Sequence, residues 1–429
     1  MAGNNSRLTH VEWKIVLLMA AVQFVNILDF MMVMPLGEDI AKAMIFSSSD
    51  IGYLGGSYTA AACIAGLVTS LFLDRFDRRR ALSVALLGLV TTTALGGLTE
   101  NLWQLIVTRV FAGFCGGPAA ALAISCVADN VHESRRGRAL GVVMGSFSMA
   151  SILGVPIGLE LALLGSWRIP FLAVAGLGVT IVLGVISVLP PQRAHIDKAT
   201  QTSFKVGKAF WNILNVLKYP GALGGLYIAL FTMLTMFMII PNIATYVQHN
   251  IAFPREYMSL LYLIGGGLSF ISMGIAGRMV DRFGSTPVTS ITTICVGIVL
   301  YLCFINYTFL ALPVLVLFPL FMLFSSARMV SNGTILSKIT PARERAGYMS
   351  LVSAVQHLAG ACGAFFSSMI LSNDDQGHFV GMDKVTTIAI VLSLLLPFIM
   401  WSVEKKVSRQ RALAAAVSAS PDPVAIMEH

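Results

Sequence analysis

Long apolar stretches alternate with short polar connections over most of the chain. A helix that crosses a bilayer needs about 20 predominantly apolar residues, and stretches of roughly that length recur through the sequence. We place them near residues 14–36, 51–72, 81–99, 102–128, 139–163, 169–190, 221–247, 256–279, 286–306, 308–336, 346–371 and 385–402. The pattern therefore predicts an all-α membrane protein with twelve transmembrane helices.

The composition supports this interpretation. Hydrophobic residues make up 56% of the 429 residues and charged residues only 12%, whereas a soluble domain has about 25% charged residues. The first stretch contains Asn26 and Asp29 and has no small-residue cleavage site behind it, so we expect a retained span rather than a removed signal peptide. The six cysteines show neither metal nor disulfide spacing, and we expect no metal and no cofactor.

The formal net charge of +8 follows from topology. With the amino terminus inside, 23 of the 29 Lys and Arg residues fall on the cytoplasmic side, as positive-inside orientation requires. The basic character therefore does not indicate a nucleic-acid partner. We expect both termini to be cytoplasmic in a bacterial-type inner membrane.

A polar stretch over residues 191–218 interrupts the apolar pattern and predicts a cytoplasmic linker between two halves, 1–190 and 219–403. The tail over 404–429 is rich in Ala, Ser and Pro near its end, and we expect it to be disordered. Three features recur in both halves at a spacing of about 210 residues, which favours a duplicated fold. They are Asp74-Arg75-Phe76 with Asp281-Arg282-Phe283, Arg109 with Arg328, and Arg136 with Arg345.

The first of these repeats resembles the loop signature of the major facilitator superfamily, Gly-x-x-x-Asp-Arg-x-Gly-Arg-Arg. Asp74, Arg75, Arg78 and Arg79 match it, while Ser70 and Asp77 occupy its glycine positions; in the second half Gly277, Asp281, Arg282 and Gly284 match. The resemblance covers the whole chain. It implies two pseudo-symmetric six-helix bundles that transport a solute by alternating access.

The repeated loops are candidates for a conformational latch. A carboxylate near a helix N-terminus is stabilised by about 0.3–1 kcal/mol, so Asp74 at the eleventh span and Asp281 at the fifth would favour a closed cytoplasmic side. Arg75, Arg78, Arg79 and Arg282 belong to the same candidate set. The alternative is that the arginines only anchor the topology.

Asp29 is the deepest acid in the predicted spans, and Arg109 on the fourth span lies at a similar depth. The two are expected to pair, because an ionised side chain inside the membrane costs a few kcal/mol or more without a partner. Asp29 is then either a structural partner of Arg109 or a carboxylate that exchanges a proton. The segment around Asn26 and Asp29, followed by Met34-Pro35-Leu36-Gly37, resembles drug:proton antiporters, which implies a proton site. Glu160, nearer the outer interface, is interpreted as a solvated or capped charge.

The fifth span carries a second resemblance, to the antiporter motif of the same superfamily, through Gly145, Gly154, Pro156 and Gly158. This resemblance implies export by antiport. From the residues alone, spaced glycines allow close helix packing, and the glycine-rich eighth span is the expected partner in the other half.

Polar residues in the predicted spans are candidates for the substrate cavity: Asn26, Asn242, Tyr246, Gln356 and His357. His357 either titrates near neutral pH or makes an interhelical hydrogen bond. An adaptable apolar wall is predicted from Met31, Met32, Phe231, Met236 and Phe237.

We therefore expect a monomeric, proton-coupled exporter of a small organic solute, such as a drug, sugar or metabolite, with the solute, protons and the lipid bilayer as its partners. No Gly-x-x-x-x-Gly-Lys-Ser/Thr loop occurs, so ATP is not the expected energy source. No nucleophile and base show suitable spacing within the spans, which argues against an enzyme. The alternatives are a lipid or metabolite uniporter or importer, and a membrane sensor that transports nothing.

Overall fold

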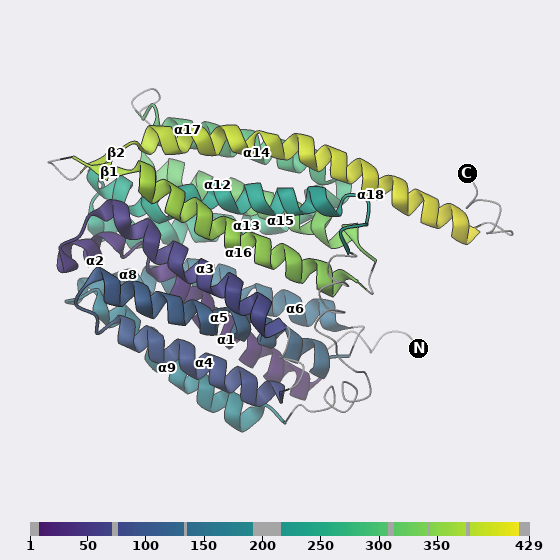
Figure 1. The fold of residues 1–429 in the computed structure, drawn as a ribbon, viewed down its shortest axis with the longest axis horizontal. Coiled ribbons are helices and arrows are strands. Elements are labelled where there is room, and N and C mark those ends of the chain that lie inside the picture. The colour runs from purple at the N-terminus through teal and green to yellow at the C-terminus, as the bar shows by residue number, and fades with distance from the viewer. Residues whose placement is uncertain are drawn as a thin grey trace.

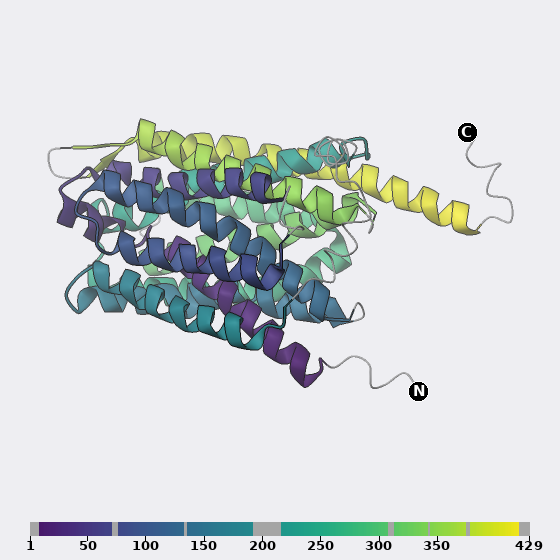
Figure 2. The same cartoon turned by 60° about the horizontal axis from the view of Figure 1, so that its bottom comes forward.

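The computed structural model describes residues 8–70, 76–132, 135–191, 216–307, 313–341, 344–374 and 378–419. Long helices run side by side along one axis of the molecule (Figure 1). The start of the first helix, at His10, and the end of the last helix, at Ala419, lie at one end of this bundle, which we call the terminal face (Figures 1 and 2). The opposite end, which carries the short helix Gly37–Met44 and the strands, is the distal face.

The first half follows the predicted order of six spans. Its elements are α1 (His10–Met32), α2 (Gly37–Met44), η1 (Ser48–Asp50), α3 (Ile51–Ser70), α4 (Arg78–Gly96), α5 (Leu102–Asn130), α6 (Arg136–Met144), α7 (Ser146–Met149), η4 (Ala150–Gly154), α8 (Val155–Leu163) and α9 (Arg168–Val188). The segments α6, α7, η4 and α8 together form the fifth span. Most of the predicted linker, over 192–215, lies outside the described residues.

The second half repeats this arrangement. Its elements are α12 (Ala222–His249), η5 (Arg255–Tyr257), α13 (Met258–Phe283), α14 (Ser285–Phe304), α15 (Val314–Ile339), α16 (Arg345–Ile370), β1 (Ser372–Asn373), β2 (Phe379–Val380), α17 (Met382–Ser393) and α18 (Leu395–Ala419). The segments α17 and α18 form the twelfth span. The short antiparallel pair of β1 and β2 at the distal face was not predicted.

Eleven helical segments of the described chain are long and apolar enough to cross a membrane. The remaining predicted span, α4, begins with three arginines and contains Thr91, Thr92 and Thr93, which lower its average apolarity. It packs between α5 and α9 within the bundle. The structure therefore confirms the all-α fold of two six-helix halves.

The twelfth span differs from the prediction at its end. Helix α18 continues past residue 403 to Ala419, so the expected disorder is wrong for residues 404–419. Glu404 explains part of this continuation, because its carboxylate accepts hydrogen bonds from the backbone N–H groups of Ser285 at 2.7 Å and Thr286 at 2.8 Å. These contacts cap the N-terminus of α14 and fix α18 at the terminal face.

The fifth span contains an irregularity that its sequence explains. Pro156 has no N–H group to donate to the carbonyl four residues earlier, and the preceding segment, Ala150–Gly154, is a π-helix. Such widened turns occur mainly as short interruptions of α-helices, frequently at functional sites. Here the interruption lies where the fifth span meets α13 of the other half.

The halves meet along two seams. Helix α3 packs against α16, and α13 packs against η4 and α8. The apolar core is continuous across the halves toward the distal face, where Met32, Leu36 and Ile40 belong to the same buried cluster as Ile239 and Ile243. At the terminal face, α12, α15, α16 and α18 form a separate buried cluster of the second half alone. The halves are therefore joined most closely at the distal face.

Candidate functional site

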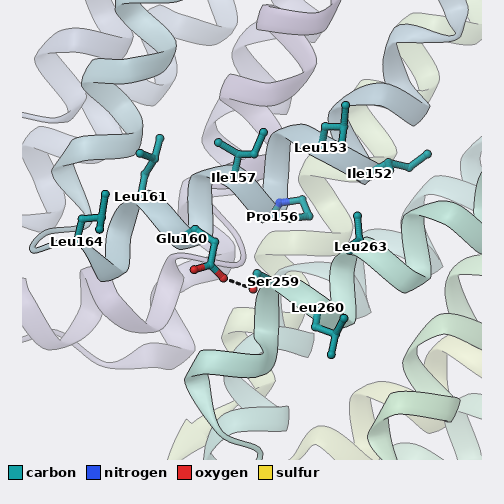
Figure 3. Close-up of a pocket in the computed structure, with 10 residues that line it drawn as sticks. All are labelled: Ile152, Leu153, Pro156, Ile157, Glu160, Leu161, Leu164, Ser259, Leu260 and Leu263. Atoms are coloured by element: carbon teal, nitrogen blue, oxygen red, sulfur yellow. Dashed lines mark hydrogen bonds between the residues drawn. The ribbon is translucent and has the colours of Figure 1, made fainter.

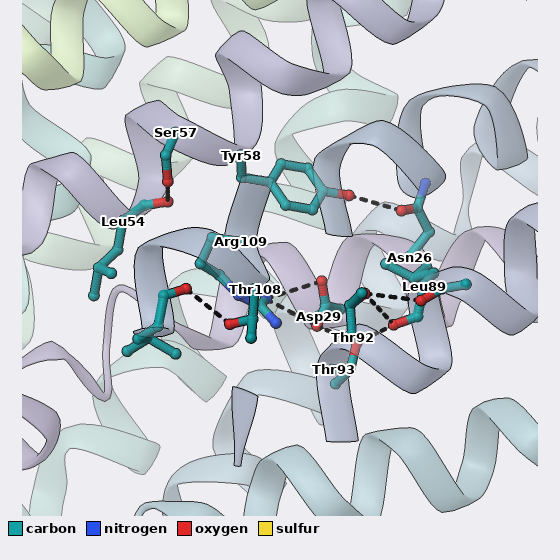
Figure 4. Close-up of polar contacts among 12 residues, drawn as sticks. Asn26, Asp29, Leu54, Ser57, Tyr58, Leu89, Thr92, Thr93, Thr108 and Arg109 are labelled. Carbon is teal, nitrogen blue, oxygen red and sulfur yellow. Dashed lines mark hydrogen bonds and ion pairs between the residues drawn. The ribbon is translucent and has the colours of Figure 1, made fainter. Parts of the chain in front are cut away.

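The predicted pair of Asp29 and Arg109 is confirmed. Arg109 Nη1 donates to both carboxylate oxygens of Asp29, at 3.0 and 3.1 Å, and Thr93 Oγ1 donates to Oδ1 at 2.7 Å (Figure 4). Asp29 is 0% exposed and Arg109 1% exposed. Three helices, α1, α4 and α5, thus enclose one ion pair in the interior of the first half.

The guanidinium of Arg109 is fixed by apolar packing on its other side. Its Cζ atom lies 5.3 Å from the centre of the Phe171 ring, a cation–π contact. Gly96 leaves room for it, because an added Cβ would lie 3.1 Å from Nη2. Nε and Nη2 of Arg109 make no hydrogen bond, so the carboxylate of Asp29 is the acceptor that holds this side chain.

Asn26 lies one turn before Asp29 and joins a second polar contact. Tyr58 Oη donates to Asn26 Oδ1 at 2.9 Å (Figure 4). Asn26 Nδ2 donates to the carbonyl of Gly116 at 3.1 Å. A Cβ at Gly116 would lie 2.2 Å from Tyr58 Oη. The contact therefore requires glycine at this position and ties α1, α3 and α5 together.

A cavity of about 110 Å³ lies between the halves, next to this polar core. Its wall is apolar and rich in methionine and aromatic side chains: Phe30, Met31, Met34, Pro35, Phe147, Met233, Met236, Phe237, Ile240, Tyr262 and Met329. The rings of Phe30 and Phe237, from opposite halves, lie 5.8 Å apart. Flexible Met side chains adapt to ligands of different shape.

Three residues of the predicted apolar wall, Met31, Met236 and Phe237, line this cavity. The predicted polar candidates lie elsewhere. Asn242 is buried and donates to Ser367 Oγ at 3.1 Å, and the Tyr246 ring packs against Phe304. Asn26 lies behind the cavity wall in the contact described above.

The two remaining candidates for the substrate cavity, Gln356 and His357, are half-buried on α16. Neither is among the residues that line the cavity of 110 Å³. Their role in substrate binding stays a prediction.

The distal face carries polar contacts between the halves that sequence reasoning missed, one of them an ion pair. His249 Nε2 lies 2.6 Å from Glu38 Oε1, and Arg255 Nη2 lies 2.6 Å from Asp39 Oδ2. Both acids lie on the short amphipathic helix α2, whose apolar side packs against the bundle. The signal was present as two adjacent acids just after the first span, but their partners are distant in the sequence.

Part of the predicted conformational latch lies at the terminal face. Asp74 and Arg75 lie outside the described residues. Arg78 Nη1 pairs with Asp129 at 3.1 Å, and Arg79 donates to the carbonyl of Ile186, so both make contacts inside the first half.

The second latch loop makes no contact with the first half in the described part of the chain. Asp281 is exposed, and the guanidinium of Arg282 lies over the ring of Phe283, the next residue. The expected contact of Asp281 with the start of the fifth span is not formed in this conformation.

The fifth and eighth spans pack together as predicted, though through different residues. A Cβ at Gly266 on α13 would lie 3.0 Å from the backbone of Ser151 in η4. The glycines of the antiporter-like motif face other neighbours: Gly154 meets Leu28 on α1, and Gly158 meets Pro170 on α9. Gly145 lies against its own helix. Glycine spacing predicted the contact, but the π-helical turn changes which residues face α13.

Glu160 lies in a groove of about 490 Å³ between α8 and α13 (Figure 3). Its carboxylate accepts a hydrogen bond from Ser259 Oγ of the other half. The groove is lined by exposed apolar side chains, among them Ile157 and Leu164. Glu160 is itself exposed, as its interpretation as a capped charge near the interface requires.

The structure thus consists of two helical halves around a central apolar cavity, with a buried ion pair beside it. Comparisons with known proteins agree. The sequence profile of the Major Facilitator Superfamily matches residues 19–318 and 225–424. The chain belongs to this superfamily of membrane transporters.

Relatives of both sequence and structure can be compared with the chain. The MFS-type transporter YfhI of Bacillus subtilis is 23% identical over 84% of this chain and 88% of its own length. A chloramphenicol resistance protein of Streptomyces lividans is 25% identical over 62% and 66%. The crystal structure of a D-xylose-proton symporter superposes with a TM-score of 0.74 at 17% identity, covering 92% of this chain and 98% of that one. This last likeness concerns the fold.

Proposed function

We propose that the protein exports a small organic solute across a bacterial inner membrane in exchange for protons, by alternating access. The observation that carries the proposal is the buried pair of Asp29 and Arg109, one residue away from the cavity-lining Phe30. A carboxylate enclosed at this depth is costly unless it is paired or protonated. It therefore responds to any movement that changes its partner or its access to water.

Asp29 would carry the proton, and Arg109 would set its affinity. The guanidinium of Arg109 and the hydroxyl of Thr93 both donate to the carboxylate of Asp29. In this structure the pair is intact and sealed from solvent. A shift of α1 relative to α4 and α5, driven by solute in the cavity, would weaken the pair and allow protonation.

The conformation supports alternating access. The contacts of His249 with Glu38 and of Arg255 with Asp39 join the halves at the distal face, whereas Arg78 and Arg79 contact Asp129 and Ile186 within the first half. The basic residues at the terminal face support a cytoplasmic orientation for it. In that orientation the structure would correspond to the state that is closed toward the outside.

The test is proton-driven transport by Asp29→Asn in proteoliposomes. Asparagine resembles the protonated acid and removes the titration, so solute binding should persist while accumulation driven by a pH gradient falls at least tenfold. Labelling of Ile45→Cys, which is 93% exposed at the distal face, with a membrane-impermeant maleimide reports the orientation of the inserted protein.

Glu100→Gln is the matched control, since Glu100 is an exposed acid in the loop between α4 and α5. It should transport like wild type. Wild-type accumulation by Asp29→Asn would remove Asp29 from the mechanism and contradict the proposal. A solute flux that ignores the pH gradient in wild type would instead indicate a uniporter.

A second candidate function is favoured by the groove around Glu160. Its apolar walls and single carboxylate suit the acyl chains and ammonium group of an amine-bearing phospholipid. The same vesicles can therefore carry a fluorescent phosphatidylethanolamine. Movement of this lipid between leaflets, lost in Glu160→Gln but kept in Asp29→Asn, would favour a lipid transporter over the solute exporter.

A further inference from the structure

The second half contains a buried cation with no acidic partner. Arg328 lies near the middle of α15 and is 2% exposed. Its Nε and Nη1 atoms make no hydrogen bond. An unpaired charge at such depth is costly. The burial of Arg328 therefore favours a bound anion that the surrounding helices do not supply.

The neighbouring helices supply no such anion. Helix α15 packs against α13, α14 and α12, and α12, α14 and α15 contain no Asp or Glu. Helix α16 contains none either. The acid nearest in sequence on α13, Asp281, is exposed at the terminal face. In the first half, by contrast, the corresponding position among α1, α4 and α5 is filled by the carboxylate of Asp29.

Hydroxyl groups without partners lie at the level of Arg328. Thr289 Oγ1 on α14 contacts Ser331 Oγ at 2.8 Å and Asn332 Oδ1 at 3.2 Å on α15. One turn toward the distal face on these antiparallel helices leads to Thr293 and to Arg328. Thr293 Oγ1 makes no hydrogen bond. Thr293 therefore lies at the same level as Arg328 on the facing helix and carries an unused hydroxyl donor.

A further hydroxyl extends this set of donors. Ser325 lies three residues before Arg328 on the same face of α15, and its Oγ atom also makes no hydrogen bond. A group of buried donors without acceptors suits an anion with oxygen atoms.

This site adjoins the central cavity. Met329, next to Arg328 on α15, lines the cavity, and so does Met236 on α12. Asn332 Nδ2 donates to Thr232 Oγ1 on α12 at 2.8 Å, which brings Met236, one turn further along α12, to the level of Arg328. A solute in the cavity would therefore reach the guanidinium past flexible methionine side chains.

We propose that Arg328, with Thr293 and Ser325, binds the carboxylate of an organic anion or zwitterion, and that this anion is the transported solute. The naming of the ligand as the solute rests on the proposed transport function. Anion binding itself does not, because it is measured without any flux. Failure of proton coupling in the Asp29 test and failure of the Arg328 site are thus distinguishable.

The test is thermal unfolding of the purified protein in detergent, in a low-salt buffer without carboxylates, with sodium benzoate or sodium chloride added at equal ionic strength. Benzoate offers a carboxylate with an apolar body that suits the cavity. We expect a saturable rise of the unfolding midpoint of wild type with benzoate and a smaller one with chloride. Arg328→Met, which keeps the length of the side chain but removes its charge, should show no response.

Two variants make the result decisive. Lys384→Met removes an exposed cation of α17 and should respond to benzoate like wild type. Thr293→Asp supplies the missing carboxylate inside the protein, so it should fold and show no response, even if Arg328→Met fails to fold. A wild-type response in either Arg328→Met or Thr293→Asp would overturn the site. An equal response to chloride and benzoate would overturn the assignment to a solute carboxylate and indicate a resident inorganic anion.

Discussion

The two halves bury an arginine in comparable surroundings but treat its charge differently. In the first half, Arg109 is neutralised by Asp29 and further fixed by Phe171. In the second half, Arg328 is as deeply buried, but α12, α14 and α15 carry no acid, and Asp281 on α13 is exposed at the terminal face. The first half therefore holds a complete ion pair, and the second half holds only the cation.

This difference favours different roles for the two arginines, with Arg109 in proton coupling and Arg328 in ligand recognition. A complete pair is stable in the absence of ligand and changes only when a proton arrives, which suits coupling. A lone cation is stabilised only by a partner that comes from outside the chain, which suits recognition. In a duplicated fold, loss of the acid from one half would leave the scaffold intact and open a binding position.

The largest expected effect separates the two arginines by stability. Removing one partner of a buried pair leaves an uncompensated charge and costs about 3–5 kcal/mol, so Arg109→Met should lower the unfolding midpoint strongly. Arg328→Met removes a charge that has no partner, and in buffer without small anions it should be as stable as wild type or more stable. Chemical denaturation in detergent measures both.

The control for this comparison is the double variant Asp29→Asn with Arg109→Met, which removes both charges and should recover much of the loss. Equal destabilisation by Arg109→Met and Arg328→Met would show that Arg328 has an internal partner and that the halves do not differ.

A smaller effect is expected from packing around the polar core of the first half. In Gly116→Ala the new Cβ would lie 2.2 Å from Tyr58 Oη and 2.6 Å from Asn26 Oδ1, so both side chains must move. Overpacking of this kind costs about 1–3 kcal/mol. Solute binding should weaken as well, because Tyr58 packs against the cavity-lining Phe30 at 5.0 Å.

Gly267→Ala on α13 is the matched variant, since an added Cβ there meets no atom within 4 Å. Alanine favours a helix by up to about 1 kcal/mol over glycine, so this protein should be at least as stable as wild type. A loss in Gly267→Ala equal to that in Gly116→Ala would mean that glycine flexibility, rather than the space beside Tyr58, determines stability.

Much of the fold was predictable because transmembrane helices satisfy their backbone hydrogen bonds internally, which ties helix location to apolar length. The span formed by α4 was predicted despite its arginines and threonines, because the neighbouring spans require one more crossing between them. The helical continuation of α18 was missed because it depends on a contact between Glu404 and the start of α14, which no local pattern reveals.

The candidate site was predictable only for residues whose pairing depends on their depth along a helix. Asp29 and Arg109 were paired from their distances to the span ends, and the structure confirms that pair. Thr93 and Tyr58 were missed because threonines and tyrosines are common in spans and only rotation about the helix axis shows which of them face inward. The polar cavity candidates were chosen without that rotation, and Asn242 proved to be a packing contact with Ser367.

The smallest expected effect concerns the closure of the distal face, where the pair of Arg255 and Asp39 joins the halves. Asp39 and Arg255 are partly exposed, at 28% and 17% of their side chains, so their pair contributes no more than about 1 kcal/mol. Asp39→Asn should therefore shift the equilibrium toward the state open at the distal face by up to about fivefold. Distances between spin labels on the two halves at this face would report the change, with Asp50→Asn, an acid on the same face that makes no ion pair within the described chain, as the control. Because neither variant touches Asp29 or Arg328, proton coupling and the response to benzoate should stay as in wild type. A change in either property would show that the distal pair acts on the two buried arginines, and that the halves do not divide coupling and recognition as the structure indicates.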